Sequence, residues 1–142
     1  MIIGELALLT AGLFTGAALH IVVSEQPARL SLDDRAAIVS WQESYDRAKI
    51  MQGALAVIGF VLAALAYVLT TDARWLLGGL LLLANWPWTL IAMRAVNAEL
   101  GAMEAGASPG SARPLVLRWG RLHAVRAGLG LASCLVFVWA MN

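Results

Sequence analysis

Charged residues are scarce in this chain, and that scarcity decides its class. Asp, Glu, Lys and Arg make up 13% of its 142 residues, while hydrophobic residues make up 61%. An ordinary soluble domain carries about 25% charged and about 45–50% apolar residues. The mean hydropathy is +0.76. The composition therefore excludes such a domain and indicates an integral membrane protein.

Two further shortages narrow the chemistry. The chain has one cysteine, Cys134, which excludes an intramolecular disulfide and a cysteine-based zinc site. Its net charge is only +1, so the charge balance does not indicate nucleic-acid binding. The expected partners are the lipid bilayer and a lipophilic small molecule. Gly12 and Gly16 have the spacing that lets two helices approach closely in lipid. This pair is compatible with a homo-oligomer or with an ordinary packing face inside the bundle.

Apolar stretches long enough to cross a bilayer, which takes about 20 helical residues, occur four times. Their approximate bounds are 3–24, 50–70, 75–96 and 119–141. A short TDAR turn joins the second and third spans, which predicts an antiparallel hairpin. We therefore expect an all-α integral membrane protein. Residues 1–142 would form a single domain of four transmembrane helices in an antiparallel bundle.

Basic residues gather on one side of this predicted bundle. The two long loops contain Arg29, Arg35, Arg47, Lys49, Arg94, Arg113 and Arg118, whereas the opposite side has only Arg74. Lys and Arg concentrate in cytoplasmic loops. We expect the long loops to be cytoplasmic, both termini to lie outside, and the bacterial inner membrane to be the location.

The second span is predicted to extend beyond the membrane. Ser31 and Asp34 form a capping-box pattern, and neither Pro nor Gly follows until Gly53. Apolar and aromatic side chains recur on one face of this extension, and some other segment must cover them: Ile38, Trp41, Tyr45, Ala48 and Gln52. The second long loop, residues 101–114, contains GASPGSARP and is predicted to be irregular.

Polar side chains at membrane depth are costly, so each needs a reason. In this chain they fall at the cytoplasmic ends of the spans: His20, Glu25, Tyr45, Arg47, Asn97, His123 and Arg126. On the fourth span, Trp119, His123, Arg126, Gly130 and Ser133 lie within about 80° of one another. We expect this stripe to face the bundle interior, with His20, His123, Arg126 and Tyr45 as candidate catalytic residues.

The NWPWT stretch, residues 85–89, is the other unusual feature. Pro87 removes a backbone hydrogen bond and predicts a kink, while Asn85 and Thr89 share a face and can satisfy the freed groups or a ligand. Tryptophans on both sides of the proline would form a flat apolar wall. The predicted substrate-binding residues are Trp41, Arg47, Asn85, Trp86, Thr89, Asn97 and Trp119.

Several chemistries remain open for these residues. His20, Glu25 and His123 are the candidate ligands of a single transition metal, iron or copper. A haem held by the two histidines ranks lower. Without any cofactor, a histidine would deprotonate an acidic phenol or enol, and Arg126 would hold the anion, which then reacts with oxygen. The competing interpretation is a structural polar network.

Taken together, several segments resemble the anthrone-oxygenase-like family. They are GLFTGAALHIVVSEQPARL, the W-x-x-S-Y-x-R-A run of residues 41–48, NWPWT followed by Asn97 and Leu100, and W-x-x-L-H-x-V-R. The resemblance implies a small four-helix membrane protein, some of whose relatives oxidise anthrones to anthraquinones in polyketide pathways. It points to His20, Glu25, Tyr45, Arg47, Asn97, Trp119, His123 and Arg126. Ala95 and Val96 stand where the family often has a proline before the asparagine.

We therefore expect a membrane-embedded oxygenase or oxidase that acts on a lipophilic aromatic molecule, anthrone-like or phenolic. Its pocket would lie at the membrane interface, lined by spans one, two and four. The alternative is a non-catalytic membrane protein, either a lipophile-binding or an assembly subunit, in which the same polar residues are structural.

Overall fold

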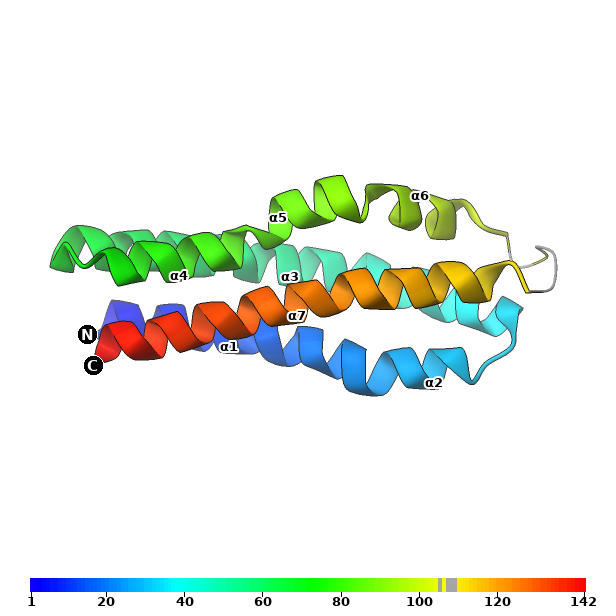
Figure 1. The fold of residues 1–142 in the computed structure, drawn as a ribbon, viewed down its shortest axis with the longest axis horizontal. Coiled ribbons are helices and arrows are strands. Elements are labelled where there is room, and N and C mark those ends of the chain that lie inside the picture. Colours follow the sequence, from blue (N-terminus) through cyan, green and yellow to red (C-terminus); the bar gives the residue numbers. More distant parts are fainter. Residues whose placement is uncertain (105, 107–109) are drawn as a thin grey trace.

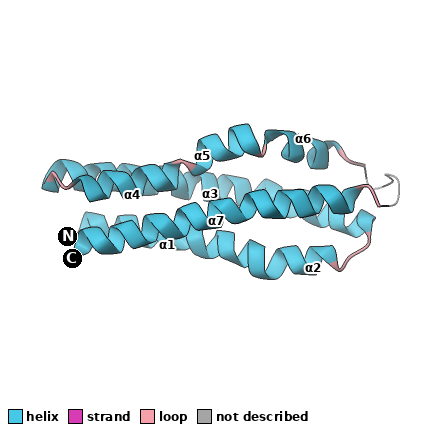
Figure 2. Ribbon diagram, viewed as in Figure 1, coloured by secondary structure: helices cyan, strands magenta, loops and turns pink. Residues whose placement is uncertain are grey.

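The computed structural model describes residues 1–104, 106 and 110–142. Part of the second long loop, residues 105 and 107–109, lies outside the described residues. Within them the chain is almost entirely helical (Figure 2). The elements are α1 (Ile2–His20), the π-helical segment η1 (Ile21–Glu25), α2 (Gln26–Leu30), α3 (Asp34–Thr70), α4 (Ala73–Leu83), α5 (Asn85–Pro87), the π-helical segment η2 (Trp88–Ala92), α6 (Arg94–Ala102) and α7 (Ala112–Met141).

Helical segments long and apolar enough to cross a membrane occur four times among the described residues. They are Ile2–Leu30, Asp34–Thr70, Ala73–Ala92 and Ala112–Met141. Their outward faces carry many exposed Leu, Ile and Val side chains, which is the surface that lipid requires. The protein is an all-α integral membrane protein, as the composition predicted.

The four long segments pack as a bundle. α1 packs on α3 and α7, and α4 packs on the same two helices, so α1 and α4 lie diagonally opposite. Figure 1 shows successive segments running in opposite directions, with both termini and the α3–α4 turn at one end. The long connections lie at the other end.

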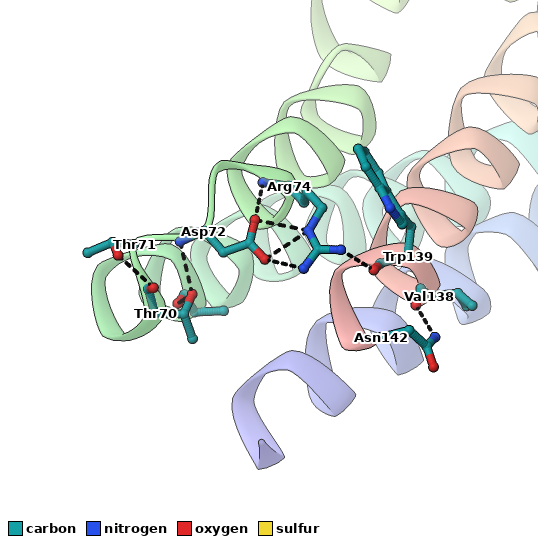
Figure 3. A network of polar contacts seen from close by, with 8 residues as sticks. Thr70, Thr71, Asp72, Arg74, Val138, Trp139 and Asn142 are labelled. Atoms are coloured by element: carbon teal, nitrogen blue, oxygen red, sulfur yellow. Dashed lines mark hydrogen bonds and ion pairs between the residues drawn. The ribbon is translucent and has the colours of Figure 1, made fainter.

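The tight turn between α3 and α4 is closed by paired polar groups (Figure 3). Thr71 adopts a left-handed conformation (φ 56°) at the C-terminus of α3, and its N–H donates to the Tyr67 carbonyl. Asp72 caps α4 by accepting from the Arg74 N–H at 2.9 Å. The Arg74 guanidinium bonds the same carboxylate and donates to the Trp139 carbonyl at 2.7 Å, which ties the turn to α7.

Small residues let the helices approach closely in the half of the bundle near the termini. Its core contains Ala7, Ala11, Ala63 and other alanines around Phe14 and Phe137. A Cβ added at Gly78 would lie 2.5 Å from the Phe137 ring. The Ser133 hydroxyl donates to the Gly78 carbonyl at 2.8 Å, so α7 and α4 are also joined by a hydrogen bond.

The extension of span two is confirmed, but its start is not the one predicted. α3 is a single helix of 37 residues, and its N-cap is Asp33, whose carboxylate accepts from the Ala36 N–H at 2.9 Å. Ser31 instead donates to the Ala28 carbonyl at the end of α2. The predicted capping box with Ser31 is therefore wrong, because Ser31 closes the preceding helical turn.

The second long loop is shorter than predicted. α6 continues to Ala102, and α7 begins at Ala112, so both ends of the segment predicted to be irregular are helical. Pro114 lies in the first turn of α7, where its missing N–H costs no hydrogen bond. Glycines and prolines in the segment indicated a break, but they did not place it.

The NWPWT stretch interrupts the third span, as predicted. α4 ends at Leu83, and after Ala84 the chain continues through α5 and η2 along a displaced axis (Figure 1). The Asn85 amide donates to the Leu82 carbonyl at 2.9 Å, and the Thr89 hydroxyl donates to the Asn85 carbonyl at 2.8 Å. Both side chains therefore satisfy backbone groups around the kink.

Candidate functional site

An aromatic stack joins α3 to α7 in the half of the bundle with the long connections. Tyr45 stacks on Trp41, with ring centroids 4.6 Å apart. Trp41 meets Trp119 edge to face at 5.8 Å, and Trp119 stacks on His123 at 4.7 Å. The stack places His123 in the interior, where it is 1% exposed.

The predicted stripe on the α3 extension is covered, as expected. Ile38, Trp41 and Gln52 are buried, and Tyr45 and Ala48 are half-buried. Val96 and Leu100 of α6 pack in the same cluster as Trp41, together with Val116 and Trp119 of α7. α6 also fixes the stack by a hydrogen bond, because the Trp119 indole donates to the Asn97 side-chain oxygen at 3.0 Å.

The polar stripe on α7 faces inward, as predicted. Trp119, His123, Arg126, Gly130 and Ser133 are all buried. Gly130 is packed so closely that an added Cβ would lie 2.6 Å from the Thr15 hydroxyl. The remaining surface of α7 carries its exposed residues, including Arg118 and Arg121.

A cavity of about 190 Å³ opens beside this stripe, between α3, the kinked third span and α7. Its walls are formed by Tyr45, Lys49, Gln52, Gly53, Ala56, Asn85, Trp86, Thr89, Leu90 and Arg126. Trp86 and Leu90 are 43% and 60% exposed, so one side of the mouth is apolar and lies on the outer face of a membrane-spanning segment, while the exposed Lys49 also lines the cavity. The Trp86 indole donates to the Gly53 carbonyl at 3.2 Å across that mouth.

A second, much smaller cavity of about 10 Å³ adjoins the first. It shares Tyr45, Lys49, Gln52 and Arg126 with the larger cavity. Its other walls are Ile21, Arg29, Trp41, Ser44, Ala48, Trp119 and His123. Arg126 therefore stands between the larger cavity and the imidazole one helical turn away.

Several buried polar atoms around these cavities have no hydrogen-bond partner among the described residues. The unpaired buried atoms are Trp41 Nε1, Gln52 Nε2 and Oε1, Asn85 Oδ1, His123 Nδ1 and Nε2, Arg126 Nε and Arg29 Nε. The Ala18 carbonyl approaches the imidazole, but outside normal hydrogen-bond geometry. An unsatisfied buried polar group costs about 1–3 kcal/mol, so their concentration at one place needs an explanation.

Arg126 is the most costly of these groups. The side chain is 7% exposed, and its guanidinium lies 5.6 Å from the centre of the Phe14 ring. No carboxylate among the described residues forms a salt bridge with it. Arginine stays protonated, so a positive charge is held at the cavity wall without a counter-ion from the described part of the chain.

Three of the predicted residues, His20, Arg47 and Glu25, do not reach this site. His20 is exposed and lines neither cavity, and Arg47 is exposed on α3. The Glu25 carboxylate pairs with Arg29 at 3.4 Å and accepts from the Ser44 hydroxyl at 2.8 Å. Glu25 therefore faces α3, away from the larger cavity.

The predicted metal site is not assembled. In residues 1–104, 106 and 110–142, no group of three His, Cys, Asp or Glu side chains is arranged to hold a metal ion. His20 is exposed, Glu25 is taken up by Arg29 and Ser44, and only His123 is buried at the cavity. The reason is geometric, because α1 turns His20 toward the outside. The same orientation leaves the haem alternative without its second axial ligand at this site.

The sequence profile of the anthrone oxygenase family matches residues 41–136, which is more than half of the chain. The chain belongs to the anthrone oxygenase family. No curated protein and no solved structure matches it.

Anthrone oxygenase similarity covers the cavity but not the first helix. The matched range contains Tyr45, Asn85, Trp119, His123 and Arg126, whereas His20 and Glu25 precede it. The segment that matches this family therefore contains all the residues that line the larger cavity, whereas Ile21 and Arg29 of the smaller cavity precede it.

Sequence reasoning missed two members of the site. Gln52 was recognised only as the end of a stripe, although an amide inside the uncharged run 50–70 was itself a signal. Arg29 was counted as a loop charge, but it is 2% exposed, bonds Gln26 at 3.0 Å and lies over the Trp119 ring at 5.8 Å. The Glu25–Arg29 spacing of four residues was the available sign.

Proposed function

We propose that the protein is a membrane-embedded oxygenase that oxidises a lipophilic aromatic molecule, anthrone-like or phenolic, in the larger cavity. The observation that carries this proposal is Arg126. A buried cation without a carboxylate partner among the described residues, at the wall of a cavity bordered by apolar side chains, suits a ligand that becomes an anion during the reaction. Membership of the anthrone oxygenase family supports the same reaction class.

His123 is the proposed base. Its ring nitrogens have no partner in normal hydrogen-bond geometry among the described residues, and Trp119 fixes the ring by stacking. A neutral imidazole takes a proton from the acidic carbon or hydroxyl of the substrate, and the resulting enolate or phenolate oxygen lies against Arg126. The base lies behind Arg126 at the smaller cavity, so the substrate must extend past the arginine to reach it.

The reaction balances with molecular oxygen as the oxidant. The deprotonated carbon of an anthrone attacks oxygen, and the peroxide that forms takes up the proton held by His123. Loss of water from the hydroperoxide leaves a carbonyl. In sum, the two methylene hydrogens leave in one water molecule, one oxygen atom enters the product as the new carbonyl, and His123 is regenerated as the neutral base.

Trp86, Tyr45 and Asn97 have positioning roles in this proposal. Trp86 offers a flat wall at the mouth, and Tyr45 borders both cavities. Asn97 acts through Trp119, which it holds by a hydrogen bond. The substrate enters from the bilayer, because the mouth is bordered by the exposed Leu90 and Trp86 of the third span.

The basic loops support the topology proposed from the sequence. Both long connections lie at the end of the bundle opposite the termini (Figure 1). Because Lys and Arg concentrate in cytoplasmic loops, we place that end in the cytoplasm, with the termini outside and the bacterial inner membrane as the location. The cavity then lies near the cytoplasmic interface.

One observation favours the alternative, a non-catalytic lipophile-binding protein. The space beside His123 is only about 10 Å³, and the imidazole packs tightly on Trp119. In that case the larger cavity binds an aromatic molecule, but no proton transfer takes place.

The test measures oxygen consumption and quinone formation by the purified protein supplied with anthrone. We expect His123→Asn to lower the rate by about 100-fold or more, since a positioned base contributes about 10²–10⁴-fold. Arg126→Lys should also lower it, because the compact ammonium has a different geometry from guanidinium. Arg121→Gln, at an exposed position of the same helix, is the matched control.

The enzyme proposal fails if the wild-type protein binds anthrone without consuming oxygen, or if His123→Asn remains folded and fully active. Circular dichroism of each variant separates loss of chemistry from loss of fold. Metal analysis and an absorption spectrum of the purified protein accompany these measurements.

A further inference from the structure

Gln52 is the most unusual neutral residue of the bundle. It lies on α3 within the uncharged run 50–70 and is 1% exposed. Within the described part of the chain, neither its Nε2 donor nor its Oε1 acceptor has a hydrogen-bond partner. A buried amide with both functions unpaired is destabilising, and the fold gains nothing visible from it.

The other two glutamines provide an internal comparison. Gln26 donates to the Val116 carbonyl at 2.6 Å and accepts from Arg29 at 3.0 Å, so it joins α2 to α7. Gln42 donates to the Leu100 and Met103 carbonyls at 3.0 and 2.9 Å and holds the end of α6. Both have structural partners, whereas Gln52 has none in the part of the chain that the structure describes.

The position of Gln52 explains the difference. It is one of the four residues that line both cavities, and Arg126 is another. Asn85, across the larger cavity, also has an unpaired side-chain oxygen. The inner wall therefore presents a cation and an amide donor for an oxygen atom, and two amide acceptors for a hydroxyl group.

We propose that Gln52 is a specificity-determining residue that recognises a free phenolic hydroxyl group on the bound aromatic molecule. Its Oε1 accepts from the hydroxyl, and its Nε2 donates to an oxygen atom of the ligand. A ligand without the hydroxyl leaves Oε1 unpaired and binds more weakly, since a buried polar group built for a hydrogen bond discriminates against a ligand that cannot form it. This inference rests on the proposed function, because it assigns the ligand to the same cavity.

The experiment measures binding and not turnover. Anthraquinone and 2-hydroxyanthraquinone differ only in one hydroxyl, which is too far from the carbonyls to form an internal hydrogen bond, and neither is a substrate for oxidation of a methylene. Their dissociation constants are measured by quenching of tryptophan fluorescence in detergent micelles of one composition. We expect the wild-type protein to bind 2-hydroxyanthraquinone about tenfold more tightly, the equivalent of one hydrogen bond to a buried group.

In Gln52→Leu the ratio of the two dissociation constants should fall to within about twofold of unity. Because each variant is compared with itself, general damage to the cavity cancels. Gln52→Met repeats the measurement should Gln52→Leu fail to fold. Gln42→Leu, which removes an amide of the same helix that lines neither cavity, should keep the wild-type ratio.

The inference is overturned if the wild-type ratio is close to one, if neither quinone binds, or if the Gln52 variants keep the tenfold preference. Failure of the proposed function has a different signature. In that case the ratio depends on Gln52, but anthrone is not oxidised.

Discussion

Arg74 and Arg126 each lie over an aromatic ring, at 5.2 Å from Trp139 and 5.6 Å from Phe14, yet their surroundings differ. At the tight turn, Arg74 bonds the Asp72 carboxylate and the Trp139 carbonyl (Figure 3). Arg126, in the middle of α7, has no carboxylate partner among the described residues. The turn shows that this chain pairs an arginine where pairing serves the fold, and this contrast is the basis on which we propose a ligand-binding role for Arg126.

Of the predicted changes, replacement of Arg126 should have the largest effect on activity. In Arg126→Met, anthrone oxidation should fall by about 100-fold or more, as is common when a charge stabiliser is removed. The melting temperature in detergent should stay the same or rise, because burial of an unpaired charge is costly. Oxygen consumption and thermal unfolding of the same preparation check both parts. A large loss of stability would mean that Arg126 is structural.

The tightly packed half of the bundle should respond to a single added methyl group. Gly78→Ala places a Cβ 2.5 Å from the Phe137 ring, and such overpacking costs about 1–3 kcal/mol. The control is Gly12→Ala, since nothing lies within 4 Å of a Cβ at Gly12. Thermal unfolding of the two variants should differ clearly, and equal melting temperatures would contradict the packing described for α4 and α7.

A larger side chain at the mouth of the cavity should lower catalytic efficiency without changing the stability of the fold. A Cβ at Gly53 would lie 3.7 Å from the Trp86 ring, an ordinary contact, so Gly53→Ala fits. Gly53→Leu would obstruct entry and should lower kcat/KM for anthrone by about tenfold, or about 1.4 kcal/mol, with a smaller effect for alanine. Identical kinetics in both variants would mean that the substrate enters elsewhere.

The smallest effect concerns pH at the turn. Hydrogen bonds from the Arg74 side chain and then its backbone lower the pKa of Asp72 below its ordinary value. A lowered pKa in the folded state gives a contribution that is present above the unfolded value, about 3.9, and is lost as the pH falls through the folded value. The difference in melting temperature between wild type and Asp72→Asn should therefore be constant near neutral pH and vanish in strong acid.

The parts of the structure that follow from composition and periodicity were predictable. The four spans, the extended second helix and the inward stripe of α7 each depend on the spacing of residues within one helix. The relation between helices was not available in that way. His20 and His123 have similar expected depths, but α1 turns His20 outward, and no pattern within α1 fixes that rotation relative to α7.

Gln52 and Arg29 were not assigned to the site for the same reason, because the relation between helices is not visible in the sequence. Each belongs to the site only because helices distant in sequence meet there, and their unpaired or shared hydrogen bonds appear only after packing. The residues of α7 were easier to recognise, since their polarity stands out against a long apolar helix.

The π-helical segment η1 has a consequence for how the first helix meets its neighbours. A π-helical turn accommodates an extra residue within a continuous helix, and each residue advances an α-helix by about 100°. Deleting one residue from Ile21–Glu25 would therefore swing Gln26 and Arg29 by roughly that angle, away from Val116 and Trp119. The wider turn therefore sets the rotation of α2 relative to α1. With this rotation α1 presents an apolar face to lipid, while α2 contacts the aromatic stack.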